Sequence, residues 1–199
     1  MSNIDDVQIH EIVQQVLKQV MGLQPQNASP KVPVSLTEPK KGFGEQAGDR
    51  KVVAIGADHG GISLKEFLIP DLVGMGFEVK DVGTYSKAPV DYPDYAHEVA
   101  KMVGSGKAWR GIMIDGAGIG SCIVANKVPG VRAGMAYDYS SAVNGREHND
   151  TNVLTLGAGL IGVNLAKQIV KTWLSTEFGG DRHTRRVEKI SIVEKLYLK

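Results

Sequence analysis

The 199-residue chain lacks several features that mark particular protein classes. Cys122 is its only cysteine, which excludes an intramolecular disulfide and disfavours a cysteine-ligated metal site. No apolar run approaches the roughly 20 residues that a membrane-spanning helix needs. The N-terminus also lacks the basic and then apolar order of a secretory signal. These absences predict a cytoplasmic protein with no place in a membrane.

Neither sign of charge is in excess. The chain has 23 Lys and Arg against 22 Asp and Glu, and its net charge is +1. A nucleic-acid-binding domain usually carries a basic patch or stripe, and none is evident, so nucleic acid is not an expected partner. Apolar residues make up 42% of the chain, which is enough for a sizeable core.

Composition separates the first 50 residues from the rest. Within 1–22, apolar residues recur at the spacing of one helical face, which predicts an amphipathic helix. Residues 23–50 hold several prolines among polar residues, a composition typical of a flexible linker. The tethered helix either folds back or pairs with its own copy, or it docks into a groove of another protein.

Residues 51–199 alternate short apolar runs with helical patterns and form the third predicted unit. We predict strands over 52–57, 77–82, 111–115, 131–136 and 152–156. We predict helices over 62–75, 93–104, 119–127, 139–147, 161–176 and 184–197. Pro70 should kink or restart the first helix. The alternation predicts an α/β fold whose parallel sheet is covered by helices on both faces.

Polar residues follow two of the predicted strands. Asp58 and His59 come after the first strand, and Asp115 ends the third, just before the glycine loop 116–120. Because ligands of parallel sheets bind at the carboxyl ends of strands, both groups should line one crevice. Small loop residues let backbone N–H groups approach an anion at the start of a helix. The spacing differs from G-x-G-x-x-G, so a nicotinamide cofactor is not expected.

Three further stretches carry candidate site residues. His148, in "REHNDTN", suits a general acid or base, or it is a helix-end histidine bonded to backbone. Arg182 and Arg186 share one face if a helix has begun there, and arginine pairs suit phosphate, although a solvated basic face is the alternative. Tyr92 precedes a proline, where extended backbone is favoured, and is otherwise an ordinary loop tyrosine.

Taken together, the motifs resemble one family. The matching stretches are "GADHGG", "DVGTYS", "VDYPDYA", "DGAGIGSCIVANKVPGVRAG", "REHNDTNVLTLGAGLIG" and "GGDRHTRRVEKI". They resemble the B-type ribose-5-phosphate isomerases and their galactose-6-phosphate isomerase relatives. The resemblance implies a Rossmann-like three-layer α/β/α sandwich with a five-stranded parallel sheet, and a homodimer or tetramer. It also implies aldose–ketose isomerisation of a sugar phosphate through a cis-enediolate, without metal or cofactor.

The resemblance also implies roles for single residues. His148 would open the sugar ring. The sugar or phosphate would be contacted by Asp58, His59, Tyr92 and Asn149. The enediolate oxygens would be bound by the backbone N–H groups of Gly116, Ala117, Gly118, Ile119 and Gly120. Arg182 and Arg186 would bind the phosphate, either within the chain or from the neighbouring subunit.

This chain departs from the family where proton transfer is expected. Many relatives have a cysteine at the position of Asp115, and others have a glutamate at the position of Ser121. Asp115 is therefore the only proton-accepting side chain at either place, and we predict that it is the isomerisation base. The neighbouring glycine loop would stabilise the developing oxyanion. Cys122 is predicted to be a small buried packing residue.

Two alternatives stay open. Asp115 could instead be structural, in a non-catalytic sugar-phosphate-binding or cargo protein on the same fold. Many relatives also have a phosphate-binding arginine at the position of Gly159, so a sugar phosphate other than ribose 5-phosphate is a second alternative. A nucleotide-binding module is disfavoured by the glycine spacing.

The first 50 residues lie outside the resemblance. Their helix and linker look like peptides that target enzymes into bacterial microcompartments. This implies a shell protein as the partner of residues 1–22 and a location inside such a compartment.

Overall fold

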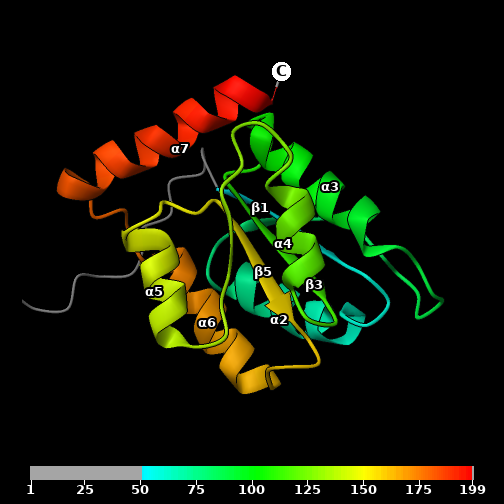
Figure 1. Cartoon of the computed structure of the whole chain (residues 1–199). Helices are drawn as coiled ribbons and strands as arrows, with labels where there is room; N and C mark the ends of the chain where they lie inside the picture. The colour runs from blue at the N-terminus through cyan, green and yellow to red at the C-terminus, as the bar shows by residue number, and fades with distance from the viewer. Residues whose placement is uncertain (1–50, 199) are drawn as a thin grey trace, which may run out of the picture. The chain divides into compact units, whose positions relative to one another are not determined.

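The computed structural model describes residues 51–198, so the predictions for residues 1–50 lie outside the described part of the chain. Its centre is a sheet of five parallel strands in the order β2-β1-β3-β5-β4 (Figure 1). The strands are β1 Val52–Ala57, β2 Glu78–Asp81, β3 Arg110–Asp115, β4 Ala133–Met135 and β5 Val153–Gly157. The predicted five-stranded parallel sheet is confirmed.

Helices cover both faces of the sheet. They are α2 Ile62–Gly74, α3 Tyr92–Gly104, α4 Ile119–Ala125, α5 Tyr139–Glu147 and α6 Val163–Ser175, with a 3₁₀ turn η1 Asp181–His183 before α7 Thr184–Tyr197. Residues of α2, α5 and α6 pack into one core cluster, and residues of α3 and α4 pack into another (Figure 1). The sheet between them completes the predicted α/β/α sandwich.

The central strand β3 shows why the sheet separates two cores. All six of its residues are buried, as expected for a parallel strand with helices on both sides. Ile112 and Ile114 belong to the cluster that includes α2 and α6, whereas Met113 belongs to the cluster with α3. Successive side chains of a strand point to opposite faces, so one apolar run serves both cores.

The helix α2 corrects one prediction. It runs continuously through Pro70, so the helix does not restart there, which was one of the two expected outcomes. Proline removes the N–H that would bond the carbonyl of Glu66. Both Pro70 and Glu66 are exposed, so water can satisfy that carbonyl.

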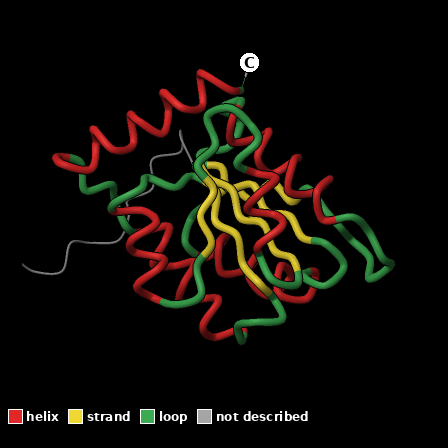
Figure 2. The backbone as a smooth tube through the Cα atoms, in the orientation of Figure 1, coloured by secondary structure: helices red, strands yellow, loops and turns green. Residues whose placement is uncertain are grey.

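The last helix, α7, stands apart from the layers. It lies beyond the edge at which the strands begin, and Figure 2 shows it separate from the sheet. None of its residues is buried. Its exposed apolar side chains are Ile190, Ile192, Val193, Leu196 and Tyr197. Among residues 51–198, no helix combines the length and apolar character needed to cross a bilayer.

Candidate active site

The first group of candidate residues lies where β1 and β3 end. These neighbouring strands run on to helices α2 and α4, and the N–H of Asp58 donates to the carbonyl of Ile114 at 3.1 Å. A Cβ at Gly61 would lie only 2.4 Å from that same carbonyl oxygen, so the loop after β1 packs directly on β3. We call Asp58, His59, Tyr92, Asp115 and residues 116–121 the strand-end cluster. The structure brings them together at the ends of these two neighbouring strands.

Asp115 is tied to its own loop by four hydrogen bonds. Its Oδ1 accepts from the N–H groups of Ala117, at 2.8 Å, and Gly118. Its Oδ2 accepts from the N–H of Ser121 at 3.1 Å and from the Ser121 hydroxyl. The Asp115 residue is only 4% exposed and Ser121 is fully buried. The carboxylate therefore holds the loop in shape at the start of α4, and its lone pairs are occupied.

The same contacts reduce the number of loop N–H groups that are available to bind the enediolate oxygens. Two of the loop N–H groups assigned to the enediolate, those of Ala117 and Gly118, point to Asp115 instead. Within the described residues, the N–H groups of Gly116, Ile119 and Gly120 have no acceptor in the protein. Ile119 and Gly120 open α4, where unpaired N–H groups and the helix dipole favour an anion. Three backbone donors thus remain for substrate oxygens.

Tyr92 lies over the same loop because residue 120 is glycine. A Cβ at Gly120 would fall 2.6 Å from the Tyr92 hydroxyl and closer still to the ring. Tyr92 is the first residue of α3, and His59 Nδ1 lies 3.2 Å from both the backbone N and O of Val90, just before that helix. The tyrosine and the histidine therefore both lie close to the start of α3, beside the glycine loop.

A second carboxylate belongs to the strand-end cluster. Asp58 is 7% exposed, and its Oδ1 accepts from the N–H groups of Gly60 and Gly61, both at 2.9 Å. Its Oδ2 has no hydrogen-bond partner within residues 51–198. Among those residues, the one polar side-chain atom that is both inaccessible to solvent and without a partner is Thr155 Oγ1, so Asp58 Oδ2 is still accessible to solvent. Asp58 can therefore offer one free oxygen to a substrate hydroxyl.

Cys122 is partly buried rather than fully buried as predicted. Burial raises the pKa of its thiol, and its sulfur lies 3.5 Å from the carbonyl oxygen of Ala133. A raised pKa disfavours the thiolate, which is the reactive form of cysteine.

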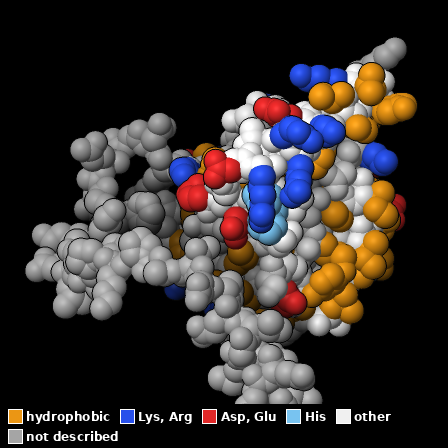
Figure 3. Space-filling view, turned by 60° about the vertical axis from the view of Figure 1, so that its left-hand side comes forward, with side chains coloured by type: hydrophobic (Ala, Val, Ile, Leu, Met, Phe, Trp, Pro, Cys, Tyr) orange, Lys and Arg blue, Asp and Glu red, His pale blue; other side chains and the backbone are white. Residues whose placement is uncertain are grey.

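The second group of candidates lies where α5 ends and α7 begins. We call Asn144, His148, Asn149, Arg182, His183 and Arg186 the strand-start cluster. All of these except Arg182 line one small cavity of about 200 Å³. Figure 3 views this side of the molecule and shows histidine side chains bordered by Lys and Arg. The cluster combines a histidine pair with cationic side chains, which suits an anionic ligand.

The two histidines of this cluster are stacked. The rings of His148 and His183 are 4.2 Å apart between centroids and only 9° from parallel. His183 is 7% exposed, and burial lowers its pKa, with smaller contributions from the charges of His148, Arg182 and Arg186. Arg182 lies in η1 and donates through Nε to His183 Nε2 at 3.3 Å. It therefore does not share a face of α7 with Arg186.

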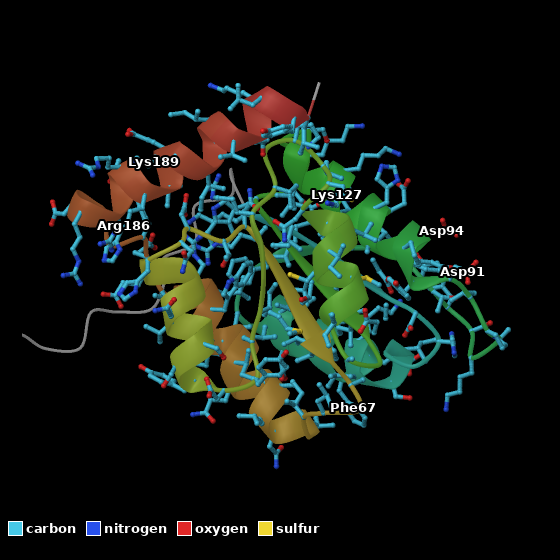
Figure 4. All side chains as sticks on the ribbon, in the orientation of Figure 1. Phe67, Asp91, Asp94, Lys127, Arg186 and Lys189 are labelled. Carbon is cyan, nitrogen blue, oxygen red and sulfur yellow. The ribbon has the colours of Figure 1, made fainter. Side chains whose placement is uncertain are left out.

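The two clusters lie at opposite ends of the parallel strands, one where the strands begin and the other where they end. His148 and Asn149 precede β5, whose first residue pairs with Gly111 near the start of β3, whereas Asp115 ends β3. A strand rises about 3.3 Å per residue, so residues 111 to 115 alone span about 13 Å. Figure 4 shows Arg186 far from Asp91, the residue before Tyr92. One chain therefore does not bring all the predicted site residues together.

Sequence reasoning did not assign roles to three residues that shape these clusters. Ser121 was considered only as the site of an absent glutamate, yet its hydroxyl binds Asp115. Asn144 and His183 contact His148. The spacing of Asn144 and His148, four residues apart on a predicted helix, was a signal that could have identified the first of these contacts.

Gly159 lies beside the glycine loop. Its N–H donates to the carbonyl of Gly116 at 3.0 Å, and a Cβ at Gly159 would sit 3.0 Å from the same oxygen. The position is therefore at the strand-end cluster. Glycine supplies no cation there.

Comparisons with known proteins agree with this architecture. Residues 53–190 match the family model described as Ribose/Galactose Isomerase. The chain is 46% identical to ribose-5-phosphate isomerase B of Escherichia coli over 73% of this chain and 97% of that protein. It is 44% identical to D-erythrulose-4-phosphate isomerase of Pectobacterium atrosepticum, over 71% and 94%. A solved structure of Clostridium thermocellum ribose-5-phosphate isomerase B shares 49% identity and a TM-score of 0.72, over 73% and 99%.

The match covers well over half of this chain, and the relatives are matched over nearly their whole length. The chain belongs to the ribose/galactose isomerase family, and it is a sugar-phosphate isomerase.

Proposed function

We propose that this isomerase interconverts ribose 5-phosphate and ribulose 5-phosphate through a cis-enediolate. A base removes the C2 proton of the open-chain aldose, the C–H electron pair forms the C1–C2 double bond, and the carbonyl electron pair moves onto O1. The base then returns the proton to C1, while O1 gains a proton and the O2 hydroxyl loses one to give the ketose. The observation that carries the proposal is the set of free N–H groups on Gly116, Ile119 and Gly120 beside a buried carboxylate. Such preorganised donors stabilise the negative charge that develops on the enediolate oxygens.

Asp115 is the proposed base, and its contacts set a condition on that role. Three of its four hydrogen bonds come from backbone N–H groups that cannot turn away without moving the loop. The fourth comes from the Ser121 hydroxyl, which rotates freely about one bond. Rotation of that hydroxyl frees one lone pair on Oδ2, and this lone pair accepts the proton from C2. Asp58, with its free oxygen, is the competing base.

The complete site forms between two copies of the chain. The strand-end cluster supplies carboxylates and oxyanion donors, and the strand-start cluster supplies histidine and phosphate-binding arginines. Because the clusters lie at opposite edges of one sheet, a second copy must bring the strand-start cluster to the strand-end cluster of the first. The exposed apolar residues of α7, which follow Arg186 on the same helix, favour a second copy seated on this helix.

Mixing two inactive variants tests this arrangement. Asp115→Asn disables the strand-end cluster, and Arg186→Ala with His148→Asn disables the strand-start cluster. A two-fold dimer has two such sites, so a mixed dimer contains one intact site and one doubly damaged site. Co-expression in equal amounts should restore about a quarter of wild-type activity, because about half of the dimers are mixed.

Each variant expressed alone serves as the control for the mixture. Activity equal to the sum of the two separate variants would contradict the shared site. Chromatography with light scattering reports the oligomeric state independently, and a monomer at working concentration would also contradict it.

A four-carbon sugar phosphate is the second candidate substrate. Two points favour it. Gly159 supplies no cation at a position where the family resemblance implies a phosphate-binding arginine. One relative, 44% identical, is a D-erythrulose-4-phosphate isomerase. The ratio of kcat/KM for ribose 5-phosphate and for erythrose 4-phosphate decides between the two. Absence of turnover with both, while inorganic phosphate or sugar phosphate still binds, would instead support a non-catalytic protein.

A further inference from the structure

The contacts of Asn144 lead to an inference about the histidine of the strand-start cluster. Asn149 Nδ2 lies 3.1 Å from the backbone carbonyl of Asn144 and 3.0 Å from Asn144 Oδ1. A backbone carbonyl can only accept a hydrogen bond, so the group facing it must be the NH₂ of Asn149. That NH₂ then also faces the side-chain oxygen of Asn144, which fixes the orientation of the Asn144 amide.

The orientation of the Asn144 amide fixes the next hydrogen bond. With its oxygen turned to Asn149, its NH₂ points to His148 Nδ1 at 2.8 Å. An NH₂ group can only donate, so Nδ1 must accept and carries no proton. In a neutral imidazole the proton then resides on Nε2, the nitrogen that is free to meet a ligand.

The surroundings of the His148 ring support this assignment. The stacked ring of His183 holds the ring plane, and Arg182 donates to His183 Nε2, which keeps His183 in a neutral form. Glu147 Oε1 is 3.9 Å from His148 Nε2, too far for a hydrogen bond. The other charged group on this cavity is Arg186 of α7, and a cation does not accept a proton.

We propose that Asn144 is a positioning residue that holds His148 in its Nε2–H tautomer, so that the histidine presents a proton to the ring oxygen of a cyclic sugar phosphate. The inference rests on the proposed ring-opening role of His148. As the C1–O bond of the ring breaks, Nε2–H donates a hydrogen bond that stabilises the negative charge developing on the ring oxygen. The ring oxygen takes its proton from solvent, the anomeric hydroxyl releases its proton to solvent, and His148 stays neutral throughout. A sugar phosphate that cannot cyclise has no need of this step.

Two substitutions of nearly equal size test the proposal. Asn144→Leu removes the donor, and Asn144→Asp replaces it with a group that accepts a proton from Nδ1 and so reverses the tautomer. Both are tolerable in folding terms because Asn144 is exposed on α5. Glu147→Gln on the same helix is the control, since its carboxylate makes no hydrogen bond to the ring.

The direct measurement is ¹⁵N NMR of the imidazole nitrogens in the full chain at about pH 8, where ordinary imidazoles are neutral. The His148 signals are identified by their loss in His148→Asn. We expect Nε2–H in the wild type and in Glu147→Gln, a mixture in Asn144→Leu, and Nδ1–H in Asn144→Asp. An Nδ1–H tautomer in the wild type, or an unchanged tautomer in Asn144→Asp, would overturn the proposal whatever the enzyme's activity.

Kinetics supply the second measurement. Erythrose 4-phosphate has no free hydroxyl placed to close a five-membered ring, so its turnover should be the same in wild type and Asn144→Asp. Turnover of ribose 5-phosphate should fall roughly 10- to 100-fold in Asn144→Asp, since loss of a preorganised hydrogen-bond donor to a developing negative charge costs at least about that much in rate. Equal losses on both substrates would contradict the tautomer role and indicate structural damage. If the wild type turns over neither substrate, the proposed function fails, while the NMR result still decides the tautomer.

Discussion

The strand-end cluster is held mainly by backbone groups, whereas the strand-start cluster is held by side chains. Around Asp115 the partners are loop N–H groups and close glycine contacts. Around His148 they are an asparagine amide and a stacked imidazole. Backbone positions follow from the sheet, so the first cluster should be rigid and sensitive to the size of a residue. Side-chain positions depend on chemistry, so the second should respond to the exchange of single functional groups.

The largest effect is expected from Asp115→Asn. The change keeps the shape of the side chain and removes the proposed base, so turnover should fall by roughly 10²–10⁴-fold. Rapid-mixing or coupled assays with ribose 5-phosphate measure the loss. Loss of exchange of the C2 proton with solvent would locate it at the proton-transfer step.

The substitution Ser121→Ala separates base chemistry from loop anchoring. It removes one of the bonds to Asp115 but leaves the carboxylate, so most of the turnover should remain. If Ser121→Ala loses as much activity as Asp115→Asn, loop anchoring explains both results. If Asp58→Asn is inactive while Asp115→Asn is not, the base is Asp58.

Gly120→Ala tests the rigidity of the strand-end cluster. The added methyl would lie within 2.6 Å of Tyr92, which must move together with the start of α4. A displacement of about 1 Å in an active site can cost on the order of 10²-fold in rate, and we expect a loss of that size in kcat/KM.

A double substitution checks the cause of this loss. In a Tyr92→Ala background the clash is absent, so adding Gly120→Ala should cost little more. Gly74→Ala, at a glycine with nothing within 4 Å of an added Cβ, is the control outside the site. Full additivity of the two changes at the cluster would argue against direct contact between Tyr92 and the loop.

Arg186→Ala tests the strand-start cluster and should have a smaller effect. A charge-assisted contact to a partly buried anion contributes about 1.5–3 kcal/mol, so KM should rise roughly 10-fold or more. Inorganic phosphate should compete with substrate in the wild type and less well in the variant. Arg185→Ala is the matched control, because Arg185 is its exposed neighbour on α7 and does not line the cavity. Equal KM values for the two variants would show that Arg186 does not bind the phosphate and is an ordinary solvent-exposed side chain.

The sequence predicted the strand-end cluster well because chain order and sheet rules are enough to place it. Asp58 and Asp115 each follow a buried strand, and parallel strands bring their ends to one edge. The same rule places His148 at the other edge, because it lies between a helix and the strand that follows. The position of His148 before its strand therefore already indicated that it lies far from Asp115 within one chain.

The hydrogen bonds of Asp115 lay beyond sequence reasoning. They depend on which way the N–H groups of Ala117, Gly118 and Ser121 point, and this direction is set by the loop conformation, including the positive φ of Gly118. The pattern "DGAGIGS" predicts donors near a carboxylate, but it does not say whether the donors face the carboxylate or the substrate. The structure divides them between the two.

The smallest effect on catalysis is expected from removing residues 1–45, which contain no part of either cluster. The predicted helix over 1–22 and most of the linker would be lost, while the sandwich that begins at β1 keeps both of its core clusters. Melting temperature and isomerase activity should therefore be nearly unchanged. A short amphipathic helix gains most of its stability from packing of its apolar face, so residues 1–22 are expected to fold on a partner. That partner is predicted to be a microcompartment shell protein, so the truncation should abolish co-purification with shells, and residues 1–50 fused to a fluorescent protein should direct it into them. Unfolding of the truncated protein would assign the helix to the core, and a fusion that stays diffuse in shell-producing cells would contradict the targeting role.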